Sequence, residues 1–232
     1  YDDLARRHAF ALPLPAGARV IDAGCGTGRW LPEWLARGCV VTGIENSPGM
    51  VERLAAFRRV EGFTLLRSAM EEAELPPGEA DLVLALGSMQ YARDPALMLH
   101  RFRTWLRPGG TVCLYVDSLV ALVLELHRCG RGADADRLLD TRRGTLRHGG
   151  VNASMRLYDR RDLDADLSAA GFVDLSFHGL AVGATLYGRD GLAERLRRDE
   201  AATMAREAGL AEMAAFVDLG LHILAIGRRP MD

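Results

Sequence analysis

The feature that most constrains the fold is a regular alternation, from Arg19 to Val116, of short apolar runs with longer segments of helical periodicity. The short runs are rich in β-branched residues and are apolar at successive positions, which is typical of strands covered by helices on both faces of a sheet. The pattern predicts repeated strand-helix-strand units and a parallel sheet. The predicted strands are Val20–Ala23, Val40–Ile44, Phe63–Leu66, Leu82–Leu86 and Val112–Val116.

Capping and turn residues predict where the helices between these strands begin and end. Three helices follow from such signals: Arg29–Arg37 before Gly38, a helix from Ser47-Pro48 through Phe57, and a helix that begins at Asp94-Pro95. The last of these carries an apolar stripe, and Pro108-Gly109-Gly110 is expected to end it before the next strand.

After Asp117 the pattern loosens into about 40 residues that hold an apolar helix and an arginine-rich stretch. Regular order returns at Asp159. The elements expected beyond Asp117 are the helices Ser118–Leu126 and Asp159–Ala170, a strand through about Phe177, a charged helical insertion over Asp190–Phe216, and a closing strand, Leu219–Ile226. We find no linker, and therefore expect one domain over residues 1–232.

Composition narrows the class of protein further. The 232 residues are 49% hydrophobic, which suffices for one large core, and the net charge of -2 gives no general attraction to nucleic acid or anionic lipid. The four cysteines form no CxxC pair, so we expect a cytoplasmic protein without disulfides or a metal site. No apolar stretch is long enough to span a membrane, and no signal peptide is evident. The chain begins at Tyr1 rather than methionine, which is compatible with a native N-terminus that lies further upstream.

The most informative motif is a buried strand that runs into the glycine-rich turn Gly24-Cys25-Gly26-Thr27-Gly28. Glycines at such a turn let the backbone bend sharply and approach a ligand closely. Asp22 precedes the turn, and Glu45 ends the next strand, where a carboxylate can accept hydrogen bonds from ribose hydroxyls. A nicotinamide oxidoreductase is disfavoured, because the third glycine comes one residue too early for the dinucleotide fingerprint.

At these residues the chain resembles the class I S-adenosylmethionine-dependent methyltransferases, in particular small-molecule enzymes related to those of ubiquinone synthesis. The resemblance extends to Ala80–Ala85 and Leu106–Gly110, and weakly to Tyr158–Phe172. It implies a Rossmann-like α/β fold with a doubly wound seven-stranded sheet in the order 3-2-1-4-5-7-6, whose last strand is antiparallel. It also implies a cofactor-binding core over about 15–117 and helical insertions, or lid segments, after strands 5 and 6, over about 118–158 and 180–216.

The resemblance also implies roles for individual residues. The glycines would shape the pocket for the methionine and ribose parts of S-adenosylmethionine, Asp22 would lie near the sulfonium, Glu45 would bind the ribose, and Asn46 would lie beside adenine. Ser68 or Ala69 stands where the family often has an aspartate, so a backbone N–H from Met70 is the expected adenine contact. The full predicted cofactor set is Asp22, Gly24, Cys25, Gly26, Gly28, Glu45, Asn46, Ala69, Met70, Leu86 and Gly87.

The expected reaction is methyl transfer to O, N or C of a small molecule, in secondary or cofactor metabolism, with S-adenosylhomocysteine as product. In-line displacement needs alignment of the nucleophile, and a general base only for some acceptors. The candidate base or pocket residues are His127, His148, Tyr91 and Tyr158. Two alternatives remain open: a cyclisation or similar reaction that uses the bound cofactor without methyl transfer, and methylation of RNA or protein. A homodimer is also open.

The stretch from His127 to His148 has a local surplus of arginine over aspartate. Its six arginines are residues 128, 131, 137, 142, 143 and 147. Such a surplus suits either a solvated surface, which is the more frequent case, or the capture of an anionic acceptor.

Overall fold

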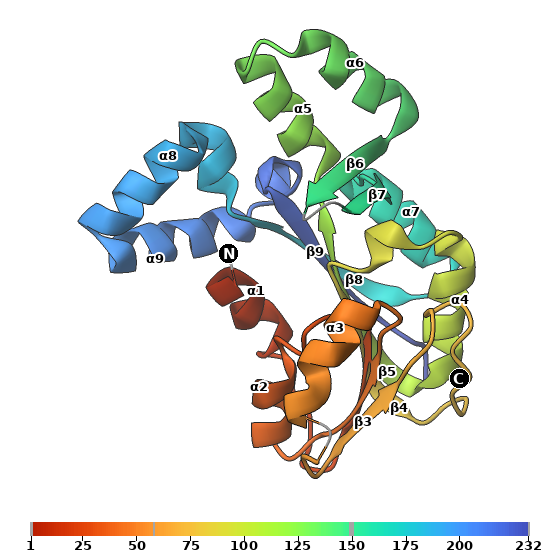
Figure 1. Cartoon of the computed structure of the whole chain (residues 1–232). Coiled ribbons are helices and arrows are strands. Elements are labelled where there is room, and N and C mark those ends of the chain that lie inside the picture. The colour runs from red at the N-terminus through yellow and green to blue at the C-terminus, as the bar shows by residue number, and fades with distance from the viewer. Residues whose placement is uncertain (1, 58, 149–150, 232) are drawn as a thin grey trace. The chain divides into compact units, whose positions relative to one another are not determined.

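The computed structural model describes residues 2–57, 59–148 and 151–231. Its main sheet has seven strands in the order β3-β2-β1-β4-β5-β9-β8 (Figure 1). Because β6 and β7 form a separate two-stranded sheet, β8 and β9 are the sixth and seventh strands of the main sheet. The predicted order 3-2-1-4-5-7-6, with an antiparallel last strand, is therefore confirmed.

The strands of the main sheet are β1 (Arg19–Ala23), β2 (Val40–Ile44), β3 (Phe63–Leu66), β4 (Ala80–Leu86), β5 (Leu106–Asp117), β8 (Val173–Leu180) and β9 (His222–Arg228). The helices are α1 (Asp2–Ala9), α2 (Leu31–Ala36), α3 (Pro48–Arg53), α4 (Pro95–Trp105), α5 (Leu119–Arg128), α6 (Gly132–Thr141), α7 (Arg160–Ala169), α8 (Val182–Arg198) and α9 (Glu200–Ala211). Short 3-10 helices are η1 (Leu54–Phe57), η2 (Met89–Tyr91) and η3 (Ala214–Leu219).

The chain divides into two compact units that interleave along the sequence. One comprises residues 13–114, 165–175 and 226–232, and the other comprises residues 1–12, 115–164 and 176–225. The first unit contains β1 to β4 and the glycine-rich turn, and the second contains the helical segments that follow β5 and β8. A single domain over the whole chain stays a prediction.

In the first unit, β1 lies at the centre of the parallel strands. It pairs with β2 on one side and with β4 on the other, so that Asp22 lies opposite Gly43 and Leu84. The helices α2 and α3 lie on one side of these strands and α4 lies on the other (Figure 1). This double cover explains why the strands are apolar on both faces: Val20, Val41 and Leu82 are at most 1% exposed.

The capping residues behave as predicted in two of three cases. The Asp94 side chain accepts a hydrogen bond from the Leu97 N–H at the start of α4, and Asp159 accepts one from Asp162 N–H at the start of α7. Ser47 occupies the N-cap of α3 but makes no side-chain capping bond. The Ser47 N–H instead donates to Glu45.

Four sequence predictions need correction. The strand expected at Val112–Val116 begins at Leu106, because the Pro108–Gly110 stretch, predicted as a turn, pairs with the C-terminal segment: Gly109 N–H donates to Arg229 O and Arg229 N–H donates to Gly110 O. The last strand runs over His222–Arg228 rather than Leu219–Ile226, since Ala214–Leu219 forms η3. The second helical insertion begins at Val182 and divides into α8 and α9.

The fourth correction concerns the arginine-rich stretch, for which no strand was predicted. Arg143–His148 forms β6, which pairs antiparallel with β7 (Val151–Arg156).

Among the described helices, none is both long and apolar enough to span a bilayer.

Candidate functional site

The glycine-rich turn follows β1 and is fastened to the end of β2. The Gly24 and Cys25 N–H groups both donate to Ile44 O, at 2.9 and 3.0 Å. The Gly26 N–H donates to Glu45 Oε2 at 2.9 Å. The turn is thus held by three hydrogen bonds to two successive residues, Ile44 and Glu45, which fixes the backbone at the carboxyl ends of two adjacent strands.

The three glycines of the turn are required for different reasons. Gly24 has φ +79°, and a Cβ there would lie 2.4 Å from Ser88 Cβ, so a larger residue would collide with the segment after β4. Gly26 has φ +57°, and a Cβ there would meet no atom within 4 Å. A Cβ at Gly28 would collide with Leu31 and Leu54. Gly24 and Gly28 therefore serve close packing, and Gly26 faces open space.

Glu45 is the centre of a hydrogen-bond cluster. Its Oε1 accepts from the Asn46 and Ser47 N–H groups at 2.9 and 2.8 Å, and its Oε2 accepts from Gly26. The residue is only 9% exposed. An ionised carboxylate has about four acceptor positions, so three N–H donors leave room for roughly one more, on Oε2. This remaining position suits a hydroxyl donor.

Asp22 is a buried carboxyl group in β1 with an incomplete set of hydrogen bonds. It is 1% exposed, and its Oδ2 has no hydrogen-bond partner among the described residues. Burial, and secondarily the negative charge of Glu45, raise the pKa of Asp22 to about 7. An unsatisfied buried carboxyl is costly unless a donor or a positive charge lies against it. Asp22 therefore fits the cationic part of a ligand.

The other predicted cofactor residues differ in exposure. Asn46 is exposed, while Ala69, Met70, Leu86 and Gly87 are half-buried. Cys25 is buried with its Sγ against Gly43, and burial raises the pKa of its thiol well above the ordinary value. The Cys25 side chain thus packs against β2, and a ligand contact from this residue would come from its backbone.

The residues of the turn fit S-adenosylmethionine on two observations made in this unit. Asp22 offers an unsatisfied buried carboxyl of the kind that a sulfonium or ammonium group would compensate. Gly26, whose N–H donates to the Glu45 carboxylate, has open space at the position of a Cβ, and the remaining acceptor position of Glu45 is suited to a ribose hydroxyl. Both features belong to strand ends at which parallel α/β sheets bind their ligands.

The four candidates for a base or pocket wall lie in varied environments. His127 is exposed in the last turn of α5, and Tyr91 is half-buried in η2. Tyr158 is 1% exposed and has the Arg156 guanidinium 4.7 Å from its ring centroid. His148 pairs with Val151 in the β6–β7 hairpin, and its side chain lies outside the described part. A catalytic role for any of them stays a prediction.

A histidine and a carboxylate that sequence reasoning did not join meet at the end of β5. His222 Nδ1 lies 2.7 Å from Asp117 Oδ1, and the His222 ring stacks on Tyr115 with centroids 4.5 Å apart. The side chains of His222 and Asp117 are 22% and 24% exposed. Asp117 is the last residue of β5 and His222 the first of β9, so they adjoin only because these strands are neighbours in the sheet. No local motif could have indicated the pair.

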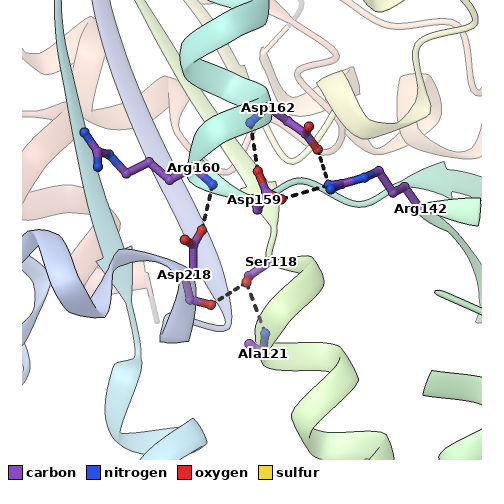
Figure 2. Close-up of polar contacts among 7 residues, drawn as sticks. All are labelled: Ser118, Ala121, Arg142, Asp159, Arg160, Asp162 and Asp218. Atoms are coloured by element: carbon purple, nitrogen blue, oxygen red, sulfur yellow. Dashed lines mark hydrogen bonds and ion pairs between the residues drawn. The ribbon is translucent and has the colours of Figure 1, made fainter. Parts of the chain in front are cut away.

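A polar network holds the backbone directly after Asp117. Figure 2 shows that Ser118 Oγ donates to Asp218 O and accepts from Ala121 N–H, while Asp218 Oδ1 accepts from Arg160 N–H at 2.6 Å. Arg142 contacts both Asp159 and Asp162 at the start of α7 (Figure 2). The network fastens the N-termini of α5 and α7 on either side of η3.

The same network bears on the arginine surplus. Arg142 is engaged by two aspartates, and Arg131 and Arg137 both pair with Asp134. Three of the six arginines are thereby paired, two with Asp134 inside the stretch and one with aspartates at the start of α7, which favours a structural and solvated role over capture of an anion.

Comparison with known proteins agrees with this geometry. A family model described as a methyltransferase domain matches residues 1–176. The ubiquinone biosynthesis O-methyltransferase of Aeromonas salmonicida is 36% identical over 99 residues, which are 41% of this chain and 42% of that protein. The chain spans about half the length of the curated relatives it matches.

Solved structures share the fold at low sequence identity. An S-adenosylmethionine-dependent methyltransferase from Mesorhizobium loti superposes with a TM-score of 0.64 at 18% identity, covering 98% of this chain and 99% of that chain. The [4+2]-cyclase SpnF superposes with a TM-score of 0.59 at 19% identity, covering 99% and 80%. By the match of its family model, its sheet order and its glycine turn, the chain belongs to the methyltransferase domain family, as a class I S-adenosylmethionine-dependent methyltransferase.

Proposed function

We propose that this protein transfers the methyl group of S-adenosylmethionine to a hydroxyl of a small organic molecule and releases S-adenosylhomocysteine. The observation that carries the cofactor half of the proposal is the Glu45 carboxylate, which is tied to Gly26 N–H and retains an acceptor position beside open space. In this proposal Glu45 binds the ribose, Asp22 lies against the cationic part of the cofactor, and Asn46, Ala69 and Met70 line the adenine.

The choice of a hydroxyl acceptor rests on the close contact between His222 and Asp117 at the end of β5 and on the name of a relative. A curated relative in ubiquinone biosynthesis is named as an O-methyltransferase. A hydroxyl must lose its proton during transfer, so a positioned base accelerates the reaction by about 10² to 10⁴. His222 is the proposed base, and Asp117 Oδ1, at 2.7 Å from Nδ1, would orient the ring.

The sulfonium of the cofactor supplies the activated methyl group. In this proposal the turn has the task of holding the cofactor. Within the other unit, His222 Nε2 has the task of receiving the acceptor proton, and Tyr115 supports the His222 ring by stacking. Ligands of α/β sheets bind outside the carboxyl ends of the strands, and Asp117 ends β5. This placement is why His222 is preferred to His127, which is exposed at the end of α5.

The test measures S-adenosylhomocysteine formation by mass spectrometry against a panel of phenolic, aliphatic hydroxyl, amine and carboxylate acceptors. With a hydroxyl acceptor, His222→Gln is expected to lower kcat by about 10² or more while the Kd for S-adenosylmethionine stays within twofold. His100→Gln, on the exposed face of α4, is the matched control. Unchanged kcat in His222→Gln would exclude this base.

The fold alone does not distinguish methyl transfer to a small molecule from a non-methylating reaction or from methylation of a macromolecule. The [4+2]-cyclase has the same fold, and at 19% identity it shows the fold and nothing more. Tight cofactor binding without S-adenosylhomocysteine formation for any acceptor in the panel would favour a non-methylating reaction. Transfer to RNA or protein but to no small molecule would favour a macromolecular substrate.

A further inference from the structure

A second cluster of titratable side chains lies in the other compact unit and has no part in the proposed transfer. His8 comes from α1, His178 from β8, and Glu212 directly follows α9. One potential ligand atom from each of the three residues lies within 4.8 Å of those from the other two. Three elements far apart in the sequence thus bring two imidazoles and a carboxylate together.

The spacing of these atoms is close to that of a metal site. His178 Nδ1 lies 3.4 Å from Glu212 Oε1, and His8 Nδ1 lies 3.7 Å from the same oxygen. Two ligands that bind zinc at 2.0–2.2 Å with tetrahedral angles are themselves about 3.3–3.5 Å apart. The two distances to Glu212 Oε1 are therefore close to a ligand-ligand distance. Binding one ion would require the stacked rings of His8 and His178 to turn, so that the lone pair of each nitrogen points toward it.

The surroundings of His8 and His178 leave ring nitrogens available to bind a metal ion. The rings of His8 and His178 stack with centroids 4.1 Å apart, and their side chains are 13% and 14% exposed. His178 Nδ1 is buried without a well-placed hydrogen-bond partner among the described residues, since 3.4 Å exceeds the usual range for a hydrogen bond. Burying an unsatisfied nitrogen has a cost that a cation bound to it would offset.

The third ligand is the most exposed of the three. The side chain of Glu212 is 60% exposed, so its carboxylate can approach a cation from the solvent side.

We propose that His8, His178 and Glu212 form a binding site for a divalent transition ion, zinc by preference, with water in the remaining position. Two nitrogen ligands and one carboxylate are a set that zinc uses in proteins. Metal binding at this site does not depend on which ligand the glycine turn binds. The ion would tie α1 to β8 and to the end of α9. The proposal does not depend on the acceptor or on methyl transfer.

The first part of the test uses the full chain without any polyhistidine tag, stripped with a chelator and titrated with Zn²⁺ by calorimetry and with Co²⁺ by visible absorption. We expect one equivalent of Zn²⁺ with a micromolar or lower Kd, and Co²⁺ bands of the intensity that four- or five-coordinate nitrogen and oxygen ligands give. Absence of a stoichiometric site in both titrations would overturn the proposal.

The second part assigns the ligands. His8→Ala, His178→Ala and Glu212→Gln are each expected to weaken Zn²⁺ binding by about 100-fold, whereas His100→Ala is expected to leave it unchanged. Zn²⁺ should raise the Tm of the wild type and of His100→Ala, but not of the three site variants. S-adenosylmethionine binding by each variant serves as the check of folding. Full Zn²⁺ affinity in His8→Ala or His178→Ala would also overturn the assignment.

Discussion

At the scale of the residue, the candidate cofactor site depends on two carboxyl groups with opposite surroundings. Glu45 accepts three backbone N–H bonds, whereas Asp22 is buried with an unsatisfied oxygen. Burial raises the pKa of Asp22 to about 7, and a buried carboxyl with a raised pKa is a common feature of functional sites. Their roles should therefore differ, with Glu45 organising the turn and Asp22 responding to the charge of the ligand.

Asp22 makes cofactor binding dependent on pH. Its pKa of about 7 in the free protein means that it is largely protonated at pH 6, and a positive ligand nearby would favour its ionised form. S-adenosylmethionine binding at pH 6 should then release up to one proton that is not released at pH 8.5. The measurement is calorimetry in buffers of different ionisation enthalpy. Asp22→Asn should lose this difference, and an equal proton release in the variant would contradict the role of Asp22.

The raised pKa of Asp22 also affects the folding stability of the ligand-free protein. A carboxyl whose folded-state pKa is raised from its ordinary 3.8 to about 7 stabilises the folded state below pH 4. That contribution is lost as the pH rises from about 4 through 7. Wild type should therefore lose stability relative to Asp22→Asn across this window.

At the scale of the element, the sequence predicted the strands and helix starts that depend on local residue patterns, and it missed the pairing of β6 with β7. The positions of β1, β2 and β3 followed from their apolar runs, and the starts of α4 and α7 followed from Asp94 and Asp159 as capping residues. The β6–β7 hairpin was missed because the arginine-rich sequence of β6 drew attention away from strands, although β7 alternates apolar with polar residues over Val151–Arg156. The Gly149-Gly150 dipeptide between them was a hairpin signal that could have indicated it.

Within the glycine turn, two matched substitutions separate folding from binding. Ala at position 24 would have φ +79° and place its Cβ against Ser88, whereas Ala at position 26 would have φ +57° and place its Cβ in open space. Gly26→Ala should cost about 1–2 kcal/mol of unfolding free energy and weaken cofactor binding at least tenfold. Gly24→Ala should cost more, because a close contact adds to the backbone strain.

Urea unfolding and calorimetry check both variants of the turn. Equal stability of Gly24→Ala and Gly26→Ala would show that the contact with Ser88 is easily relieved. Undiminished S-adenosylmethionine affinity in Gly26→Ala would mean that the open space beside Glu45 is not where the cofactor lies.

At the scale of the whole molecule, fold and cofactor class were predictable while chemistry was not. The sheet order and the cofactor class followed from one turn, one acidic residue and the strand pattern, and the family model agrees with them. The pair of Asp117 with His222 and the cluster of His8, His178 and Glu212 could not be predicted, because their members come from elements distant in the sequence. Only the packed chain brings such side chains together.

The central claim is that the turn after β1 and the Glu45 carboxylate hold S-adenosylmethionine. The most direct test is calorimetric titration of the wild type, Glu45→Ala and Glu52→Ala with S-adenosylmethionine; Glu52 is an exposed glutamate on α3, only a few residues away. We expect micromolar binding by the wild type and by Glu52→Ala, and at least tenfold weaker binding by Glu45→Ala, which corresponds to about 1.4 kcal/mol or more. Equal affinity in all three proteins, or no binding by the wild type, would contradict the account.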